Sequence, residues 1–173
     1  IQGFFDIPVD NLFSTPIFAR YIKKNIKSKN IVCIAPDVGG TERARALGRI
    51  LNVGLAIVDK RRPKPGQSQV MNVIGEVKGK TCIIVDDIID SGGTIVNAAK
   101  ALKNRGAKEV YVYITHGVLS GEAVKKIKNS VIKNLVITDT IDNKDKTKSA
   151  KNIEVLSISC LLYTSPSPRD GTK

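Results

Sequence analysis

The segment IIVDDIIDSGGT, residues 83–94, places acids and small residues at the end of an apolar run. Small residues leave backbone N–H groups open to a ligand, and the N-terminus of the predicted following helix carries partial positive charge, which suits a phosphate group. Acids beside a phosphate are unfavourable unless they bind something else, such as sugar hydroxyls or Mg²⁺. We favour a binding site over the alternative, an ordinary acidic turn with Thr94 as the N-cap. The candidate residues are Asp86, Asp87, Asp90, Ser91, Gly92, Gly93 and Thr94.

A cationic segment, DKRRPKPGQSQV at residues 59–70, follows another apolar run. Its prolines, glycine and lack of apolar periodicity predict a long mobile loop. Such a loop can close over a phosphorylated substrate and stabilise the charge that develops in a transition state. Taken alone, a solvated surface loop is the better interpretation. Together with a phosphate site at the same sheet edge, a functional loop is favoured.

A third segment, PDVGG at residues 36–40, precedes Arg43. Its glycines permit close backbone approach to an anion, and Asp37 could hold a metal ion, although a helix-start turn explains the pattern equally well. His116 is the single histidine, and a lone histidine after a strand is more typical of a hydrogen-bonded structural group. No GxxxxGK[ST] phosphate loop, GxGxxG fingerprint or zinc spacing is present.

Short apolar runs rich in Ile and Val alternate with helical stripes, and these elements must position the three segments. Strands are predicted at residues 31–35, 55–58, 82–85, 110–114 and 135–137. Helices are predicted from Thr15, around Leu47, from Ile95 to Gly106, and around Ala123. This alternation predicts an α/β fold with a mainly parallel sheet and helices on both faces. Ligand sites in such sheets lie beyond the carboxyl ends of the strands.

Composition limits the function classes. The chain has 173 residues, which suits one domain, and a formal net charge of +12. Lysines dominate that charge but are spread over several segments, and aromatic residues make up only 5%, so solvated helix faces explain it better than a nucleic-acid site. No apolar run approaches the roughly 18 residues of a membrane span. The three cysteines show no paired spacing, which fits a reducing, cytoplasmic environment.

Six segments occur in the order seen in the ribose-phosphate pyrophosphokinase family: IQGFFDIPVDNL, PDVGG, DKRRP, SQVM, VDDIIDSGGT and THGVLSG. The acidic segment alone resembles the phosphoribosyl-diphosphate loop of type I phosphoribosyltransferases, and the ordered set narrows the resemblance. It covers residues 1–159 and implies a type I phosphoribosyltransferase-like domain. Residues 160–173 have turn and linker composition, which predicts a disordered tail foreign to the natural protein, with a native regulatory tail as the alternative.

The resemblance also implies an activity and residue roles. The family transfers the diphosphoryl group of ATP to the anomeric hydroxyl of ribose 5-phosphate, with Mg²⁺, giving phosphoribosyl diphosphate and AMP. Asp86 and Asp87 would face the ribose hydroxyls, and residues 90–94 would cradle the 5-phosphate. Lys60 and Arg62 match cations that stabilise the transferring group, and Asp37 matches a magnesium ligand. Matches to a regulatory phosphate or ADP site are Gln2, Asp10, Asn11, Ser157 and Ser159.

The chain also departs from the family. Members carry two similar α/β domains in tandem, and this chain resembles the second. The resemblance therefore implies that ATP is bound mostly by the missing first domain and a neighbouring subunit of a homo-oligomer, and that the isolated chain is inactive. Ser91 replaces a more usual Thr and keeps the hydroxyl. Two other functions remain open: a nucleobase-dependent phosphoribosyltransferase, which shares the acidic segment but not DKRRP, and a non-catalytic regulatory paralogue.

Overall fold

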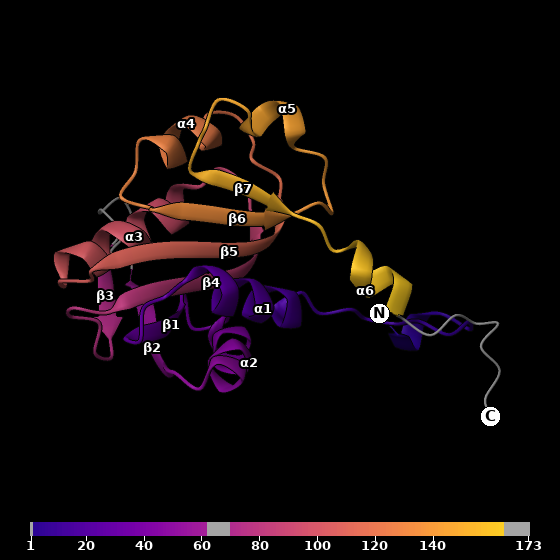
Figure 1. Ribbon diagram of the computed structural model, residues 1–173, viewed down its shortest axis with the longest axis horizontal. Coiled ribbons are helices and arrows are strands. Elements are labelled where there is room, and N and C mark those ends of the chain that lie inside the picture. The colour runs from indigo at the N-terminus through magenta and orange to yellow at the C-terminus, as the bar shows by residue number, and fades with distance from the viewer. Residues whose placement is uncertain (1, 62–69, 165–173) are drawn as a thin grey trace.

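The Ile- and Val-rich runs pair into one seven-stranded sheet with the order β3-β2-β1-β4-β5-β6-β7 (Figure 1). The computed structural model describes residues 2–61 and 70–164. All neighbouring strands are parallel except β2 and β3, which confirms the predicted mainly parallel α/β fold. The strands are β1 (Ile31–Ala35), β2 (Gly54–Arg61), β3 (Val70–Ile74), β4 (Thr81–Ile89), β5 (Glu109–Gly117), β6 (Asn134–Thr138) and β7 (Ile153–Leu156).

Helices cover both faces of this sheet, as predicted. Alternate residues of β1 separate two cores: Cys33 packs in the same core as Phe18 and Leu47 of α1 and α2. Its neighbour Ile34 belongs to the other core, with Leu102 of α3. The helices are α1 (Thr15–Asn25), α2 (Thr41–Leu51), α3 (Gly93–Asn104), α4 (Ala123–Lys128), α5 (Lys144–Thr147) and α6 (Ser159–Thr164), after a short 3-10 helix, η1 (Gln2–Phe4).

β4, which carries the first acids of the acidic segment, and its neighbour β5 are longer than the sequence predicts. β4 continues past its apolar part, and the ladder with β5 includes the pairs Ile88 with His116 and Ile89 with Gly117. Ile89 is buried, which anchors this extension against the core on the α3 side. Asp86 and Asp87 therefore lie within a strand, before the loop.

Strand pairing between β2 and β3 replaces both ends of the predicted loop at residues 59–70. β2 continues through Lys60 and Arg61, whose backbones pair with Met71 and Val70 of β3. Residues 62–69, which make up the rest of that segment, lie outside the described residues. The cationic composition of the segment gave no sign of this antiparallel pairing, because the pairing is made by backbone groups and not by the side chains.

The two ends of the described chain project from the same side of the sheet (Figure 1). The prediction of disorder from residue 160 does not agree with α6, where apolar Leu161 and Leu162 follow Cys160. Residues 165–173 of that tail lie outside the described residues. Over the described ranges, the helices are too short and too polar to cross a bilayer.

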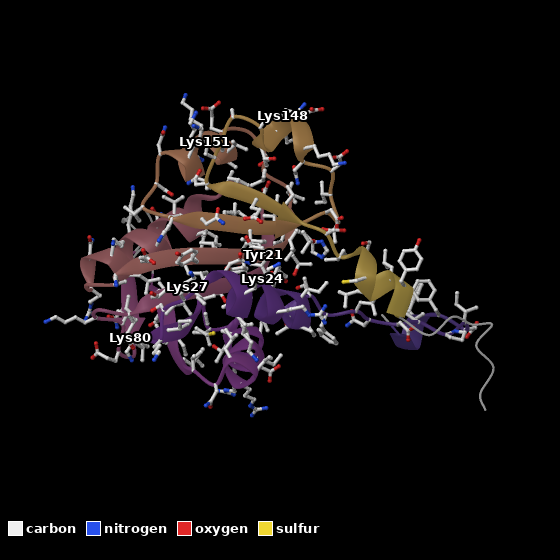
Figure 2. The ribbon with its side chains drawn as sticks, in the orientation of Figure 1. Tyr21, Lys24, Lys27, Lys80, Lys148 and Lys151 are labelled. Carbon is white, nitrogen blue, oxygen red and sulfur yellow. The ribbon has the colours of Figure 1, made fainter. Side chains whose placement is uncertain are left out.

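Lysines are distributed over separate elements. Figure 2 shows Lys24 in α1 and Lys27 just after it, Lys80 before β4, and Lys148 and Lys151 after α5. They form no single stripe in this view, which agrees with the interpretation of most of the charge as solvated surface.

Candidate functional site

The turn from β4 into α3 depends on Gly92, the N-cap of α3. Gly92 has a φ of 74°, in the left-handed region that favours glycine, and Val96 N donates to its carbonyl oxygen at 3.0 Å. A Cβ at this position would lie 3.6 Å from Ile127 of α4. The chain can thus reverse tightly and begin the helix beside the acids. The first N–H groups of α3 have no partners within the helix, as at any helix start.

A pocket of about 240 Å³ opens at this turn. It brings together most of the site residues that the sequence predicts, including Asp37 from the end of β1. An acidic wall beside a helix N-terminus suits a ligand with both hydroxyl and phosphate groups. The lining residues are Asp37, Asp86, Ile88, Ile89, Asp90, Ser91, Gly92, Gly93, Thr94 and Ile95.

Hydrogen bonds from the following elements hold the loop at residues 89–91. The carbonyl oxygen of Ile89 accepts from Val118 N at 2.9 Å and from Leu119 N at 3.2 Å. Ser120 N donates to Asp90 O at 3.2 Å, and the Lys126 ammonium donates to the third carbonyl of the loop, at Ser91. These contacts fix the loop before a ligand arrives, which reduces the entropy lost on binding.

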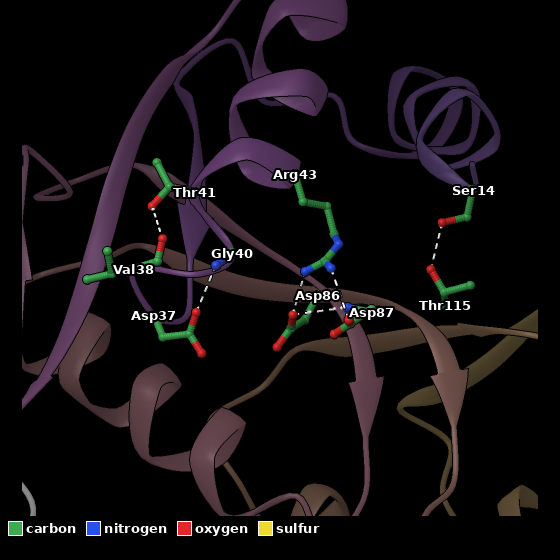
Figure 3. A network of polar contacts seen from close by, with 9 residues as sticks. All are labelled: Ser14, Asp37, Val38, Gly40, Thr41, Arg43, Asp86, Asp87 and Thr115. Carbon is green, nitrogen blue, oxygen red and sulfur yellow. Dashed lines mark hydrogen bonds and ion pairs between the residues drawn. The ribbon is translucent and has the colours of Figure 1, made fainter. Parts of the chain in front are cut away.

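Arg43 of α2 bridges the two acids of β4 (Figure 3). One guanidinium nitrogen lies 2.7 Å from Asp86 Oδ1, and the other lies 3.0 Å from Asp87 Oδ2. The Asp86 side chain is 19% exposed and that of Asp87 is 57% exposed. Sequence reasoning noted Arg43 only as a neighbour of PDVGG, because no sequence spacing shows that α2 packs beside the end of β4.

The two acids titrate differently. Burial raises the pKa of Asp86 to about 6, and the neighbouring Asp87 carboxyl adds to the rise while Arg43 opposes it. Burial also acts to raise the pKa of Asp87, but its hydrogen bond with Asp86 and the charge of Arg43 outweigh burial and lower it. The proton therefore stays on Asp86 as the pair ionises, and Asp87 carries the first negative charge.

Asp37 is positioned by the start of α2. Gly40 N donates to Asp37 Oδ1 at 2.8 Å, and Thr41 Oγ1 donates to Val38 O at 2.7 Å (Figure 3). Over the described ranges, no three His, Cys, Asp or Glu side chains converge as a metal cage. Mg²⁺ commonly takes one or two carboxylates together with waters and substrate phosphates. Asp37 and Asp86, which line one pocket, fit that mode of binding.

The predicted catalytic cations are only partly described. The backbone of Lys60 lies in β2, and because β2 and β4 both run parallel to β1, their carboxyl ends share one sheet edge. Arg62 lies outside the described residues. His116 Nδ1 lies 3.0 Å from Thr140 Oγ1, in keeping with a hydrogen-bonded structural residue.

The predicted regulatory residues lie away from this pocket, on two separate segments. Asp10 and Asn11 are exposed between η1 and α1, and Gln2 belongs to η1. Ser157 and Ser159 approach each other with their hydroxyl oxygens 3.2 Å apart, at the start of α6. Their regulatory role stays a prediction.

Comparison with known proteins relates the chain to one family model and to several similar enzymes. A family model described as "Phosphoribosyl synthetase-associated domain" matches residues 58–166. The chain is 59% identical over 162 residues to a ribose-phosphate pyrophosphokinase of Rhizobium meliloti (strain 1021), a match that covers 94% of this chain and 52% of the relative. The relative from Brucella melitensis biotype 1 is 57% identical with the same coverage. The chain thus spans about half the length of these relatives.

Solved structures show the same correspondence. Phosphoribosylpyrophosphate synthetase from Mycobacterium smegmatis superposes with a TM-score of 0.84 at 36% identity, covering 93% of this chain and 52% of that one. A purine phosphoribosyltransferase from Pyrococcus horikoshii has a TM-score of 0.54 at 20% identity and shares the fold.

Proposed function

Because the chain belongs to the phosphoribosyl synthetase-associated domain family, we propose that it is the ribose 5-phosphate-binding part of a ribose-phosphate pyrophosphokinase. The observation that carries this proposal is the pocket in which Asp86 of β4 and Asp90 of the following loop meet the N-terminus of α3. The whole enzyme transfers a diphosphoryl group from ATP to the anomeric hydroxyl of ribose 5-phosphate. The bond from the β-phosphorus of ATP to the oxygen that bridges it to the α-phosphorus breaks, and this oxygen leaves with AMP. A new bond forms between the β-phosphorus and O1 of the ribose.

The residues of this chain act by positioning and charge. The loop at residues 90–94 holds the 5-phosphate through backbone N–H groups, and Asp86 and Asp87 accept hydrogen bonds from the ribose hydroxyls. Arg43 keeps the two carboxylates together while the sugar binds. Lys60 and Arg62 stabilise negative charge on the transferring group, and the hydroxyl proton passes to solvent. Asp37 and Asp86 would hold Mg²⁺, which neutralises phosphate charge when bound.

The partners follow from this assignment. ATP is bound mostly by the other half of the enzyme and a neighbouring subunit, and the assembly is a homo-oligomer. In support, large apolar side chains are exposed on the two projecting ends, where Phe4 is 85%, Phe13 66% and Tyr163 88% exposed. Such side chains favour burial against protein. We place the enzyme in the cytoplasm, where the buried thiols of Cys33 and Cys82 stay reduced.

Thermal unfolding of the 173-residue chain tests the sugar-phosphate site. Ribose 5-phosphate with Mg²⁺ at a concentration 100 times Kd should raise Tm by about 5–10 °C, since mass action adds about 2.7 kcal/mol. Ribose without its phosphate is the control and should have little effect. No shift with ribose 5-phosphate, or equal shifts with both sugars, would contradict the proposal. AMP release from ATP and ribose 5-phosphate by the full-length enzyme tests the reaction itself, and pyrophosphate release that requires a nucleobase would favour a phosphoribosyltransferase.

A further inference from the structure

A second pocket lies between the β5–α4 turn, α4 and the segment around α5. Its volume is about 500 Å³, roughly twice that of the pocket at the acids. It therefore has room for a small organic ligand. Six residues carry its chemistry: Leu119, Ser120, Val124, Lys125, Lys128 and Lys146.

The lining of this pocket is cationic, in contrast to the acidic pocket. Three lysines from two different helices line it, together with one acid, Glu122. Glu122 lies 3.0 Å from Lys125, so that pair is already neutralised. Lys146 donates to Val118 O at 3.2 Å, which places its ammonium beside the turn. The charge of Lys128 and Lys146 gives the pocket a net positive character that attracts anions.

The wall formed by the β5–α4 turn is preformed. Leu119 is a buried non-glycine residue with a φ of 50°, a left-handed conformation that costs free energy. Hydrogen bonds from Leu119 N to Ile89 O and from Ser120 N to Asp90 O hold this conformation. A strained turn that the surrounding structure fixes is typical of binding sites, where it keeps the wall ready for a ligand. The hydroxyl of Ser120 adds a polar group to the same wall.

From this arrangement we propose a second ligand site, specific for a small phosphorylated anion, in which Lys128 and Lys146 bind the phosphate group. Lysine binds phosphate as a point charge. The partly exposed side chain of Val124 lines the remaining space, where the non-phosphate part of a ligand would lie. The phosphate comes either from inorganic phosphate or from a nucleotide. This site is separate from the sugar-phosphate pocket and goes beyond the proposed function.

Backbone amide NMR of the 173-residue chain, titrated with inorganic phosphate and in parallel with AMP, tests the site. We expect saturable shifts at residues 119–122, with a Kd different from that of shifts at residues 91–94. Saturation at 119–122 with either probe supports the site. A lower Kd for AMP identifies the nucleotide as the preferred source, and equal or higher values identify inorganic phosphate.

Two double variants separate the site from general charge effects. The variant Lys128→Gln with Lys146→Gln should weaken the response at 119–122 by about fivefold, since each lost surface ion pair contributes about 1.5- to fivefold. Its response at 91–94 should stay unchanged. The matched control, Lys148→Gln with Lys151→Gln, removes the same charge from the same region (Figure 2) but from outside the pocket, and should behave as the unmodified chain.

Two results would overturn the site: shifts confined to residues 91–94, or equal weakening in both double variants. Because the two sets of amides are read separately, absence of a response at 91–94 alone would count against the sugar-phosphate pocket. The site behind α4 would then still stand on the response at 119–122.

Discussion

The acids of β4 and the cations of β2 both lie toward the carboxyl ends of their strands, but the two strands have different neighbours in the sheet. β4 is the middle strand, paired in parallel with β1 and β5, and Asp86 lies within the β5 ladder. β2 pairs on one side with β1 and on the other with the antiparallel edge strand β3, where Lys60 stands opposite Met71. The fold thus places the acids that we propose to position the sugar in the middle strand, and Lys60, which we propose to stabilise transferred charge, in the strand beside the edge strand.

The two regions also carry opposite charge: the end of β4 is acidic and the end of β2 is cationic. Arg43 is the cation in contact with the acids of β4, and it spans two of them. The phosphorylated substrate that we propose would bring further negative charge to this pocket. Cations from the end of β2 would therefore complement the acids. We expect changes at β2 to lower kcat, and changes at the end of β4 to weaken substrate binding and stability.

Loss of a cation at the end of β2 should have the largest effect. In the full-length enzyme, Lys60→Ala should lower kcat by about 10²–10³-fold, because removing one group that stabilises transition-state charge has this effect in other enzymes. The Kd for ribose 5-phosphate should change little, since the sugar is held at the β4 end. The measurements are AMP release and calorimetric binding.

Lys80→Ala is the matched control for Lys60→Ala. Lys80 precedes β4 at the amino end of the strand, so its loss should leave kcat unchanged. A normal rate in Lys60→Ala would refute the role assigned to the cations and leave the sugar-phosphate pocket unaffected.

The turn at the β4 end can be tested with adjacent glycines. Gly92→Ala should lower the free energy of unfolding by about 1–2 kcal/mol, since a left-handed conformation is strained for alanine. It should also weaken ribose 5-phosphate binding, because Gly92 sets the start of α3. Gly93→Ala is the control: its Cβ would lie 3.9 Å from Ser91 Oγ, an ordinary contact, so stability should change by less than about 0.5 kcal/mol. Urea unfolding of the two variants measures the difference, and equal losses would show that the turn does not depend on Gly92.

Local patterns were sufficient to predict most of the fold and much of the site. The Ile- and Val-rich runs predicted the presence of β1, β2, β4, β5 and β6 because burial on both faces requires such runs, but not the full lengths of β2, β4 and β5. Asp86, Asp90 and the glycines line one pocket, as expected where parallel strands deliver such residues to one end of the sheet, whereas Asp87 is not among the lining residues. Their binding roles stay predictions.

Features that depend on tertiary contact were missed. The bridge from Arg43 to the acids requires α2 to pack beside the end of β4, and this packing cannot be inferred from the spacing of the residues in the sequence. The backbone of Lys60 pairs with that of Met71, so the hairpin is independent of the cationic side chains that dominated the prediction. The helix α6 was hidden by the turn composition of the residues that follow it.

Arg43 links α2 to the middle strand, so its removal should disturb the β4 end alone. Arg43→Met at pH 7.5 should lower the free energy of unfolding by about 1–2 kcal/mol, less than for a fully buried pair because Asp87 is more than half exposed. Arg43→Lys should recover part of this loss, since one ammonium cannot span both carboxylates. Arg45→Met, which alters an exposed residue of the same helix, is the control.

The pKa of Asp86 distinguishes positioning by Arg43 from packing alone. Carboxyl ¹³C NMR should show it rising above about 6 in Arg43→Met, because the opposing charge is gone. An unchanged pKa together with equal stability losses in Arg43→Met and Arg45→Met would show that the bridge does not hold the acids.

The smallest effect concerns the pH dependence of stability. Asp86 has a pKa of about 6 in the folded chain against an ordinary value of 3.8, so the folded state binds this proton more tightly than the unfolded state does. Its contribution to the free energy of unfolding should therefore be greatest below about pH 4 and should decline as the pH rises through 6. The lowered pKa of Asp87 acts in the opposite direction, so the net change is smaller than that from Asp86 alone.

Asp86→Asn removes this titration and keeps a polar side chain of similar size. Urea unfolding at intervals from pH 4 to 7.5 should show the unmodified chain losing stability relative to Asp86→Asn as the pH rises. Parallel curves for the unmodified chain and Asp86→Asn would mean that Asp86 is ionised in both states, and that the centre of the sheet is no less solvated than its edge.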